Sequence, residues 1–160
     1  MNLELIRSKD DFVLWFKEHL NRLNGIGSIW TVDLDPTEAA PDVTVEFEGK
    51  RVNFELAFLI INKRGIIWRL SKLQRQWHHD CAKLGKRTAL LAIVNEKNFN
   101  TLILVRSDRI PLTLSSRSRD SGCTDGTVDA LLCGKQGQDE RDIILTMLEI
   151  VFQPDYWIEE

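Results

Sequence analysis

Apolar residues recur along this chain with two spacings, and the spacing separates predicted helices from predicted strands. Helical spacing predicts a first helix over 8–24. Ser8 is a favourable N-cap residue, and two aspartates follow it in the first turn. A second helix is expected over 71–85 and a third over 139–152, which Pro154 ends. The apolar stripe of the second helix is predicted to consist of Leu73, Trp77, Cys81 and Leu84.

Alternating apolar and polar residues predict strands between these helices. The segment 43–58 shows the clearest alternation, interrupted at Glu48-Gly49, and indicates a hairpin with one buried face. The run 88–94 is almost continuously apolar, which is typical of a strand covered on both faces. Further strands are predicted over 28–35, 66–68 and 101–105. The segment 115–138 is rich in Ser, Gly, Asp and Arg and is predicted to be a long loop.

The order of these elements is α-β-β-β-(β)-α-β-β-loop-α, which predicts an α/β fold with a mixed central sheet flanked by helices. At 160 residues the chain fits a single domain, 1–160. We expect its core at about 3–112, followed by the loop 115–138 and the C-terminal helix 139–152.

The predicted hairpin would place two carboxylates close to each other. If its turn consists of Glu48 and Gly49, the numbers of opposed residues add up to 97 and Asp42 lies opposite Glu55. Directly opposed Cβ atoms lie ~4.5–5.5 Å apart, so the two carboxylates repel each other unless a proton or a cation lies between them. Hard cations such as Mg²⁺ bind carboxylate oxygens. A solvated polar face is the alternative, and a turn longer by one residue would separate the pair.

The same residues resemble a known motif. The segments 41–42 (PD) and 54–57 (FELA), on either side of the hairpin turn, resemble the PD-(D/E)xK signature of the restriction-endonuclease-like superfamily. The segment 69–74 (RLSKLQ) is similar to the LSxxQ start of the next helix in Holliday-junction-resolvase-like and VRR-NUC domains. The resemblance covers roughly residues 3–112 and implies a restriction-endonuclease-like α-β-β-β-α-β core.

The resemblance also implies a metal site. Asp42 and Glu55 match the two acidic ligands of the family, and the metal would be Mg²⁺. An acidic residue of the first helix often joins them, and Glu18 is the best-placed candidate, although exposure on the helix surface explains Glu18 equally well.

The residue that departs from the family pattern is Ala57, which stands where the family has a lysine that positions or activates the attacking water. Lys72 is the best candidate for a migrated lysine, with a solvent-facing helix position as the alternative. Gln74 matches the glutamine of the helix. His78 shares a helix face with Gln74 at i, i+4 and could line the same cleft, although a surface position is its default.

Charge and cysteine content limit the range of functions and cellular compartments that fit this sequence. Twenty-one Lys and Arg against 24 Asp and Glu give a net charge of −3, which argues against non-specific coating of nucleic acid. Basic residues nevertheless gather over 64–87 and again over 106–119. The three cysteines are not in C-x-x-C spacing, so free thiols in a reducing compartment are expected, with Cys81 in the core.

We therefore expect a nuclease-like protein of phage or mobile-element origin, with impaired or lost cleavage and a structural or nucleic-acid-associated role. The alternative is an active Mg²⁺-dependent DNA endonuclease of the resolvase-like kind that uses a migrated lysine. The expected partners are DNA, protein subunits of a larger assembly and, by family analogy, a second copy of the chain.

The location follows from two further sequence features. No apolar run approaches the ~18 residues of a membrane span. Glu4 lies where a signal peptide carries basic residues. We expect a soluble intracellular protein, cytoplasmic or associated with a virion, without a membrane partner.

Overall fold

The computed structural model describes residues 2–24, 31–34, 42–62, 65–67, 70–96, 99–110, 130–133 and 139–157. The helical elements are η1 (Leu3–Leu5), α1 (Lys9–Asn24), α2 (Lys72–Lys83), η2 (Ser107–Arg109), α4 (Glu140–Val151) and η3 (Pro154–Trp157). The strands are β1 (Thr31–Leu34), β2 (Val43–Phe47), β3 (Lys50–Asn62), β4 (Gly65–Ile67), β5 (Thr88–Glu96), β6 (Phe99–Arg106) and β7 (Ala130–Cys133).

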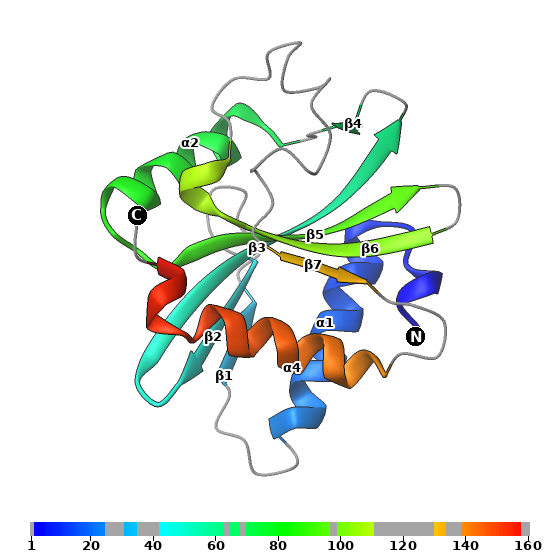
Figure 1. Cartoon of the computed structure of the whole chain (residues 1–160), viewed down its shortest axis with the longest axis horizontal. Coiled ribbons are helices and arrows are strands. Elements are labelled where there is room, and N and C mark those ends of the chain that lie inside the picture. The colour runs from blue at the N-terminus through cyan, green and yellow to red at the C-terminus, as the bar shows by residue number, and fades with distance from the viewer. Residues whose placement is uncertain are drawn as a thin grey trace.

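The described strands form one mixed sheet in the order β1-β2-β3-β5-β6-β7, with β4 paired to the end of β3. β3 and β5 run parallel, and the other paired strands are antiparallel. A parallel pair needs a crossover connection, and α2 lies within the one that joins β3 to β5. The α/β fold with a mixed sheet flanked by helices, which the sequence predicted, is confirmed (Figure 1).

The hairpin has the register that the sequence predicted. Glu48 and Gly49 both have positive φ, 50° and 76°, as a two-residue type I′ turn requires. Val45 is paired with Val52 and Val43 with Phe54, so the numbers of opposed residues add up to 97. Pro41 of the motif lies outside the described residues.

Local hydrogen bonds fix the starts of the helices. The Ser8 hydroxyl accepts from the Asp11 amide at 3.2 Å, which confirms Ser8 as the cap of α1. Ser71 and Gln74 form a complete capping box at the start of α2, each side chain accepting from the other residue's amide. Gly85 follows α2 with φ +69°, a conformation that glycine adopts without strain.

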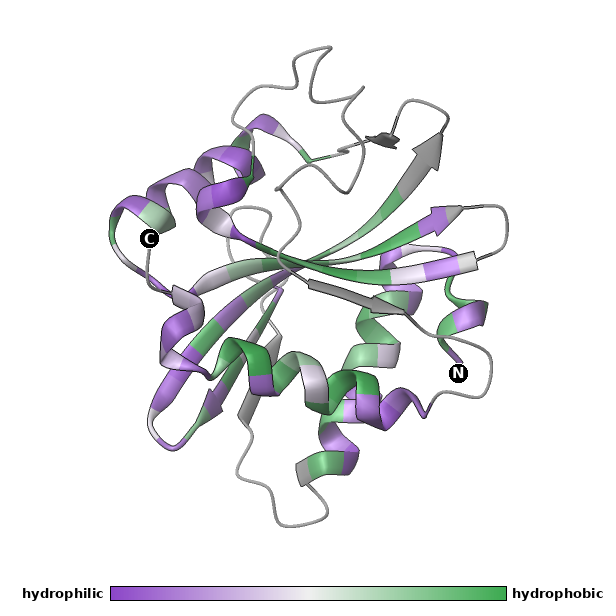
Figure 2. Ribbon diagram, in the orientation of Figure 1, coloured by the Kyte–Doolittle hydropathy of each residue, from purple (hydrophilic) through white to green (hydrophobic). Residues whose placement is uncertain are grey.

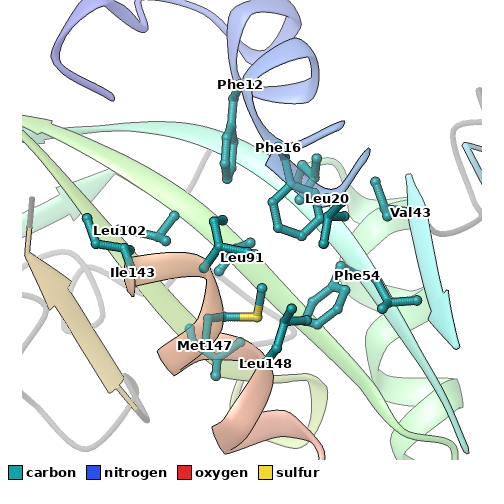
Figure 3. Close-up of a cluster of buried hydrophobic side chains, with 14 of the residues drawn as sticks. Phe12, Phe16, Leu20, Val43, Phe54, Leu91, Leu102, Ile143, Met147 and Leu148 are labelled. Carbon is teal, nitrogen blue, oxygen red and sulfur yellow. The ribbon is translucent and has the colours of Figure 1, made fainter. Parts of the chain in front are cut away.

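The larger core fills the sheet face that α1 and α4 cover. Figure 3 shows Phe12, Phe16 and Leu20 of α1 meeting Met147 and Leu148 of α4 over side chains of the sheet, and all of these side chains belong to one buried cluster. The sheet contributes alternate residues of β2, β3, β5 and β6 to it: Val43 and Val45, Val52, Phe54 and Leu56, Ala89, Leu91 and Ile93, and Leu102 and Leu104.

Glu140 ties the N-terminal segment to α4 within this half of the molecule. Its Oε2 atom accepts from Trp15 Nε1 at 2.9 Å and lies 3.1 Å from His19 Nε2. Its Oε1 atom accepts from the Leu3 amide. Three elements, η1, α1 and α4, therefore meet at one carboxylate of the first turn of α4, where the helix dipole also favours a negative charge.

The opposite sheet face, which α2 contacts through His78, carries a smaller cluster. Its members are Ala57, Leu59, Leu70, Leu90, Ala92, Val94, Ile103, Val105 and Ile110. α2 is hydrophilic along most of its length, in contrast to the apolar α4 (Figure 2). The predicted apolar stripe of α2 is wrong at both ends, because Leu73 is 62% exposed and Leu84 is 71% exposed. The buried residues of the helix are His78 and Cys81, so the face of α2 that packs against the sheet is rotated from the predicted one toward His78.

One further expectation is modified by the structure. The predicted loop 115–138 contains the strand β7, which pairs antiparallel with β6, and the rest of that segment lies outside the described residues. A four-residue apolar run is too short to be distinguished from a loop by periodicity, and the edge of β6 supplies its partner. Among the described residues, no helix is long and apolar enough to cross a membrane.

Truncation of Phe54 tests the position of the core. Phe54 is fully buried and contacts Phe16 edge to face, with ring centroids 6.1 Å apart. We expect Phe54→Ala to lower the free energy of unfolding by about 3–5 kcal/mol in urea denaturation. Leu14→Ala, at an exposed site on α1, is the matched control and should stay within about 0.5 kcal/mol of the parent. Equal losses would contradict the described core.

Candidate functional site

Asp42 begins the hairpin and is held by two groups of the protein. Its Oδ2 atom accepts from the Leu56 amide at 2.8 Å and lies 3.1 Å from the Lys9 ammonium. Lys9 is the first residue of α1, and Leu56 lies in the middle of β3. Asp42 therefore joins the start of α1 to the central strand, and a single oxygen receives both contacts.

Glu55 belongs to a buried polar chain on the α2 side of the sheet. The side chain of Glu55 is 2% exposed, and its Oε1 atom lies 3.3 Å from Nε2 of the fully buried His78. His78 Nδ1 lies 2.6 Å from Ser107 Oγ, which in turn accepts from Thr88 Oγ1 at 2.6 Å. We call Glu55, His78, Ser107 and Thr88 the buried polar chain.

Strand register explains why these four residues meet. On β3, Glu55 lies on the face opposite to Phe54 and Leu56, and it is paired with Leu90 of the parallel strand β5. The pairing of Ala89 with Arg106 continues by one residue to Thr88 and Ser107, so the two hydroxyls lie side by side where β5 begins and β6 ends. α2 then brings His78 down onto both strands.

The hydrogen bonds of the buried polar chain have one consistent direction. The Thr88 hydroxyl donates to Ser107, and the Ser107 hydroxyl can donate to His78 Nδ1 in the tautomer that carries its proton on Nε2. In the same tautomer the Nε2–H group donates to the Glu55 carboxyl. Each buried member thus has a partner, which matters because an unsatisfied buried polar group costs about 1–3 kcal/mol. The buried polar chain therefore stabilises the packing of α2, a helix that buries few apolar side chains, against the sheet.

The acid–histidine–serine order of this chain is that of a nucleophilic triad, but its geometry is that of a core. Ser107 and His78 are 3% and 0% exposed, and the serine hydroxyl is also bound by Thr88. A nucleophile must reach its substrate, whereas these atoms are covered by α2 and the sheet. The arrangement is therefore suited to holding α2 and not to attack on a substrate.

The donor set fits Mg²⁺ poorly. Mg²⁺ requires several oxygen ligands in octahedral geometry and retains water molecules. Glu55 is buried and faces an imidazole, and Asp42 has an ammonium group 3.1 Å from its oxygen, which repels a cation. Among the described residues, no group of three His, Cys, Asp or Glu side chains is placed to hold a metal ion.

The structure disperses the other predicted site residues. Glu18 lies on α1, which covers the sheet face opposite to Glu55, and pairs with Arg22 one helical turn away. Gln74 is engaged in the capping box. Lys72, the first residue of α2, is exposed. Ala57 shares a face with Glu55 as predicted, and packs in the smaller apolar cluster.

Three contributors, Lys9, Ser107 and Thr88, could not be identified from the sequence, and His78 was misplaced. Lys9, and not Lys72, is the lysine beside Asp42, a contact that depends on how α1 crosses the hairpin. Ser107 carried no signal, because a single serine after a strand is common. His78 was expected at the surface and is buried. Its spacing from Cys81 (i, i+3), a residue predicted to lie in the core, was the available hint.

Cys81 confirms the prediction of a core cysteine. It is buried beside His78 on the same face of α2. Burial raises the pKa of its thiol above the ordinary range, an effect that nearby Lys86 and a hydrogen bond with Thr88 oppose and Asp80 reinforces. A thiol of this kind is a poor nucleophile at neutral pH.

A scan against protein-family models and a search of curated proteins both found no match to this chain. The functional assignment therefore rests on the residues and their geometry.

Substitution of Asp42 tests whether this carboxylate is structural. Asp42→Ala leaves the Leu56 amide without its acceptor, and we expect it to lower the free energy of unfolding by about 1–3 kcal/mol. Asp42→Asn retains an acceptor oxygen and should cost less. Glu46→Ala removes an exposed ion pair with Arg51 and serves as the control, with a loss of at most about 1 kcal/mol. A loss for Asp42→Ala no larger than for Glu46→Ala would contradict the structural role.

Proposed function

We propose that this protein is a nuclease-like α/β protein that does not cleave nucleic acid, and that the carboxylates at the motif positions now serve the fold. The observation that carries the proposal is the burial of Glu55 against His78. A carboxylate that must bind a metal ion beside a scissile phosphate has to be reached by both, and Glu55 is covered by α2.

The residues around Glu55 support the same proposal. Ala57 occupies the position at which the PD-(D/E)xK pattern has its lysine, and it packs against apolar residues such as Leu59 and Leu70. A lysine side chain there would bury a charge in an apolar layer, which is strongly unfavourable without a partner. The motif positions are thus adapted to packing on the α2 side of the sheet.

Retention of the carboxylates also has a chemical reason in this proposal. Asp42 satisfies the Leu56 amide and pairs with Lys9, and Glu55 satisfies His78. Loss of either carboxylate would leave a polar group without its partner, so the pair can be kept by the needs of the fold alone. The role that remains is a structural or nucleic-acid-associated one.

One observation favours the alternative, an active DNA endonuclease. Lys9 places an ammonium group 3.1 Å from Asp42, next to the motif, whereas Lys72 forms no such contact. A lysine contributed by α1 could take over the task of the missing motif lysine. The poor fit of Glu55 to a metal site weighs against this alternative, and the two can be separated by one assay.

The decisive assay is cleavage of branched, duplex and single-stranded DNA in the presence of Mg²⁺ or Mn²⁺. We expect no cutting by the parent protein, because neither motif carboxylate is available to a metal ion. Asp42→Asn and Lys9→Met are run alongside, with circular dichroism to establish that all three proteins are folded. Cutting by the parent that disappears in both variants would overturn the proposal and assign the catalytic lysine to Lys9.

A further inference from the structure

A basic pocket lies where the C-terminal end of α2 meets the start of β5, the end of β6 and η3. Its volume is about 560 Å³, within the range of small-molecule sites. Figure 1 shows η3 at the end of α4 turning back toward the end of α2. The lining residues that matter for a ligand are Lys83, Lys86, Arg87 and Trp157.

The pocket has an excess of positive charge. In the part of the chain that the structure describes, Lys83, Lys86 and Arg87 form no ion pair with a carboxylate, and the two lysines are exposed. Asp108 is the one carboxylate among the described lining residues, and it is already bound to Arg106 through contacts of 3.1 and 3.2 Å. Three cations without a carboxylate partner in one concavity attract an anion.

Arg106 stabilises the wall of the pocket. Besides binding Asp108, it donates to the Tyr156 carbonyl at 2.6 Å and lies over the Tyr156 ring, 5.7 Å from the centroid. These contacts fasten η3 to the end of β6. Arg106 is thus used in building the pocket, whereas Lys83, Lys86 and Arg87 have no carboxylate partner in the described part of the chain.

Trp157 adds a flat aromatic surface with a fixed orientation. Its Nε1 atom donates to the Val151 carbonyl at 2.8 Å, and its ring packs edge to face on Tyr156, with centroids 4.7 Å apart. Thr88 and Ser107, which belong to the buried polar chain, line the same pocket. A concavity that combines an oriented indole with cations that have no carboxylate partner among the described residues matches a ligand with a phosphate and a ring.

We propose that this pocket binds a nucleotide, with its phosphate at Lys83, Lys86 and Arg87 and its base against Trp157. The lysines and the guanidinium supply charge-assisted hydrogen bonds to phosphate oxygens, and the indole supplies stacking. The nucleotide can be free or the phosphorylated end of a nucleic-acid strand. The site is separate from Asp42 and Glu55, so this proposal holds or fails independently of whether the protein cleaves DNA.

The test is isothermal titration calorimetry of the full chain with AMP, ribose 5-phosphate, adenosine and a short oligonucleotide with and without a 5′-phosphate. AMP is expected to bind saturably and more tightly than ribose 5-phosphate or adenosine, since each of these lacks one of the two recognised groups. Tighter binding of the phosphorylated oligonucleotide than of AMP would assign the ligand to a strand end. An affinity of the phosphorylated oligonucleotide equal to that of AMP would assign the ligand to the free nucleotide.

Charge reversal at the pocket provides the matched comparison. Lys86→Glu is expected to weaken AMP binding at least about tenfold, the effect of losing one charge-assisted contact. Lys17→Glu changes the net charge equally on exposed α1 and should leave the affinity unchanged. Both lysines are exposed, so both variants should remain folded. No saturable binding of AMP or of the phosphorylated oligonucleotide, or equal weakening by both variants, would overturn the proposal.

Discussion

A carboxyl side chain that leaves the central strand on an otherwise apolar face has to find a partner inside the protein, and Glu55 finds it in His78. That requirement explains the unusual character of α2. The helix leaves Leu73 and Leu84 in solvent and turns a histidine toward the sheet, because His78 connects Glu55 to Ser107 and Thr88. A polar helix is thereby fixed on the sheet by directional hydrogen bonds supplemented by few apolar contacts. The penalty for leaving any member of a buried polar network unsatisfied makes such an arrangement specific.

Different interactions consequently hold the helices on the two faces of the sheet. On one face α1 and α4 bury a continuous apolar cluster, assisted by Glu140 at its rim. On the other face the buried polar chain positions α2, and the loop that follows the helix forms one side of the basic pocket. Thr88 and Ser107 belong both to the buried polar chain and to the lining of the pocket. The hydrogen bonds that engage Glu55 therefore also hold two residues beside the pocket to which we assign nucleotide binding.

Much of the fold could be predicted because it is encoded locally. The Glu48-Gly49 turn fixes the hairpin register, Ser8 and Ser71 mark helix starts, and the unbroken apolar run of β5 identifies a strand covered on both faces. The site could be predicted only in part. Asp42 and Glu55 were found because they share the hairpin, but their partners Lys9 and His78 come from helices whose placement depends on tertiary packing. β7 was missed because four apolar residues carry too little periodicity without the β6 edge that pairs with them.

The most direct test of this account is a double-mutant cycle between Glu55 and His78. The free energy of unfolding is measured by urea denaturation for the parent, Glu55→Ala, His78→Ala and the double variant. If the two side chains stabilise the fold through each other, the double variant will lose less than the sum of the single losses, with a coupling energy of about 0.5–3 kcal/mol. Losses that add within about 0.3–0.5 kcal/mol would show independent side chains, and would contradict the claim that Glu55 is retained as the structural partner of His78.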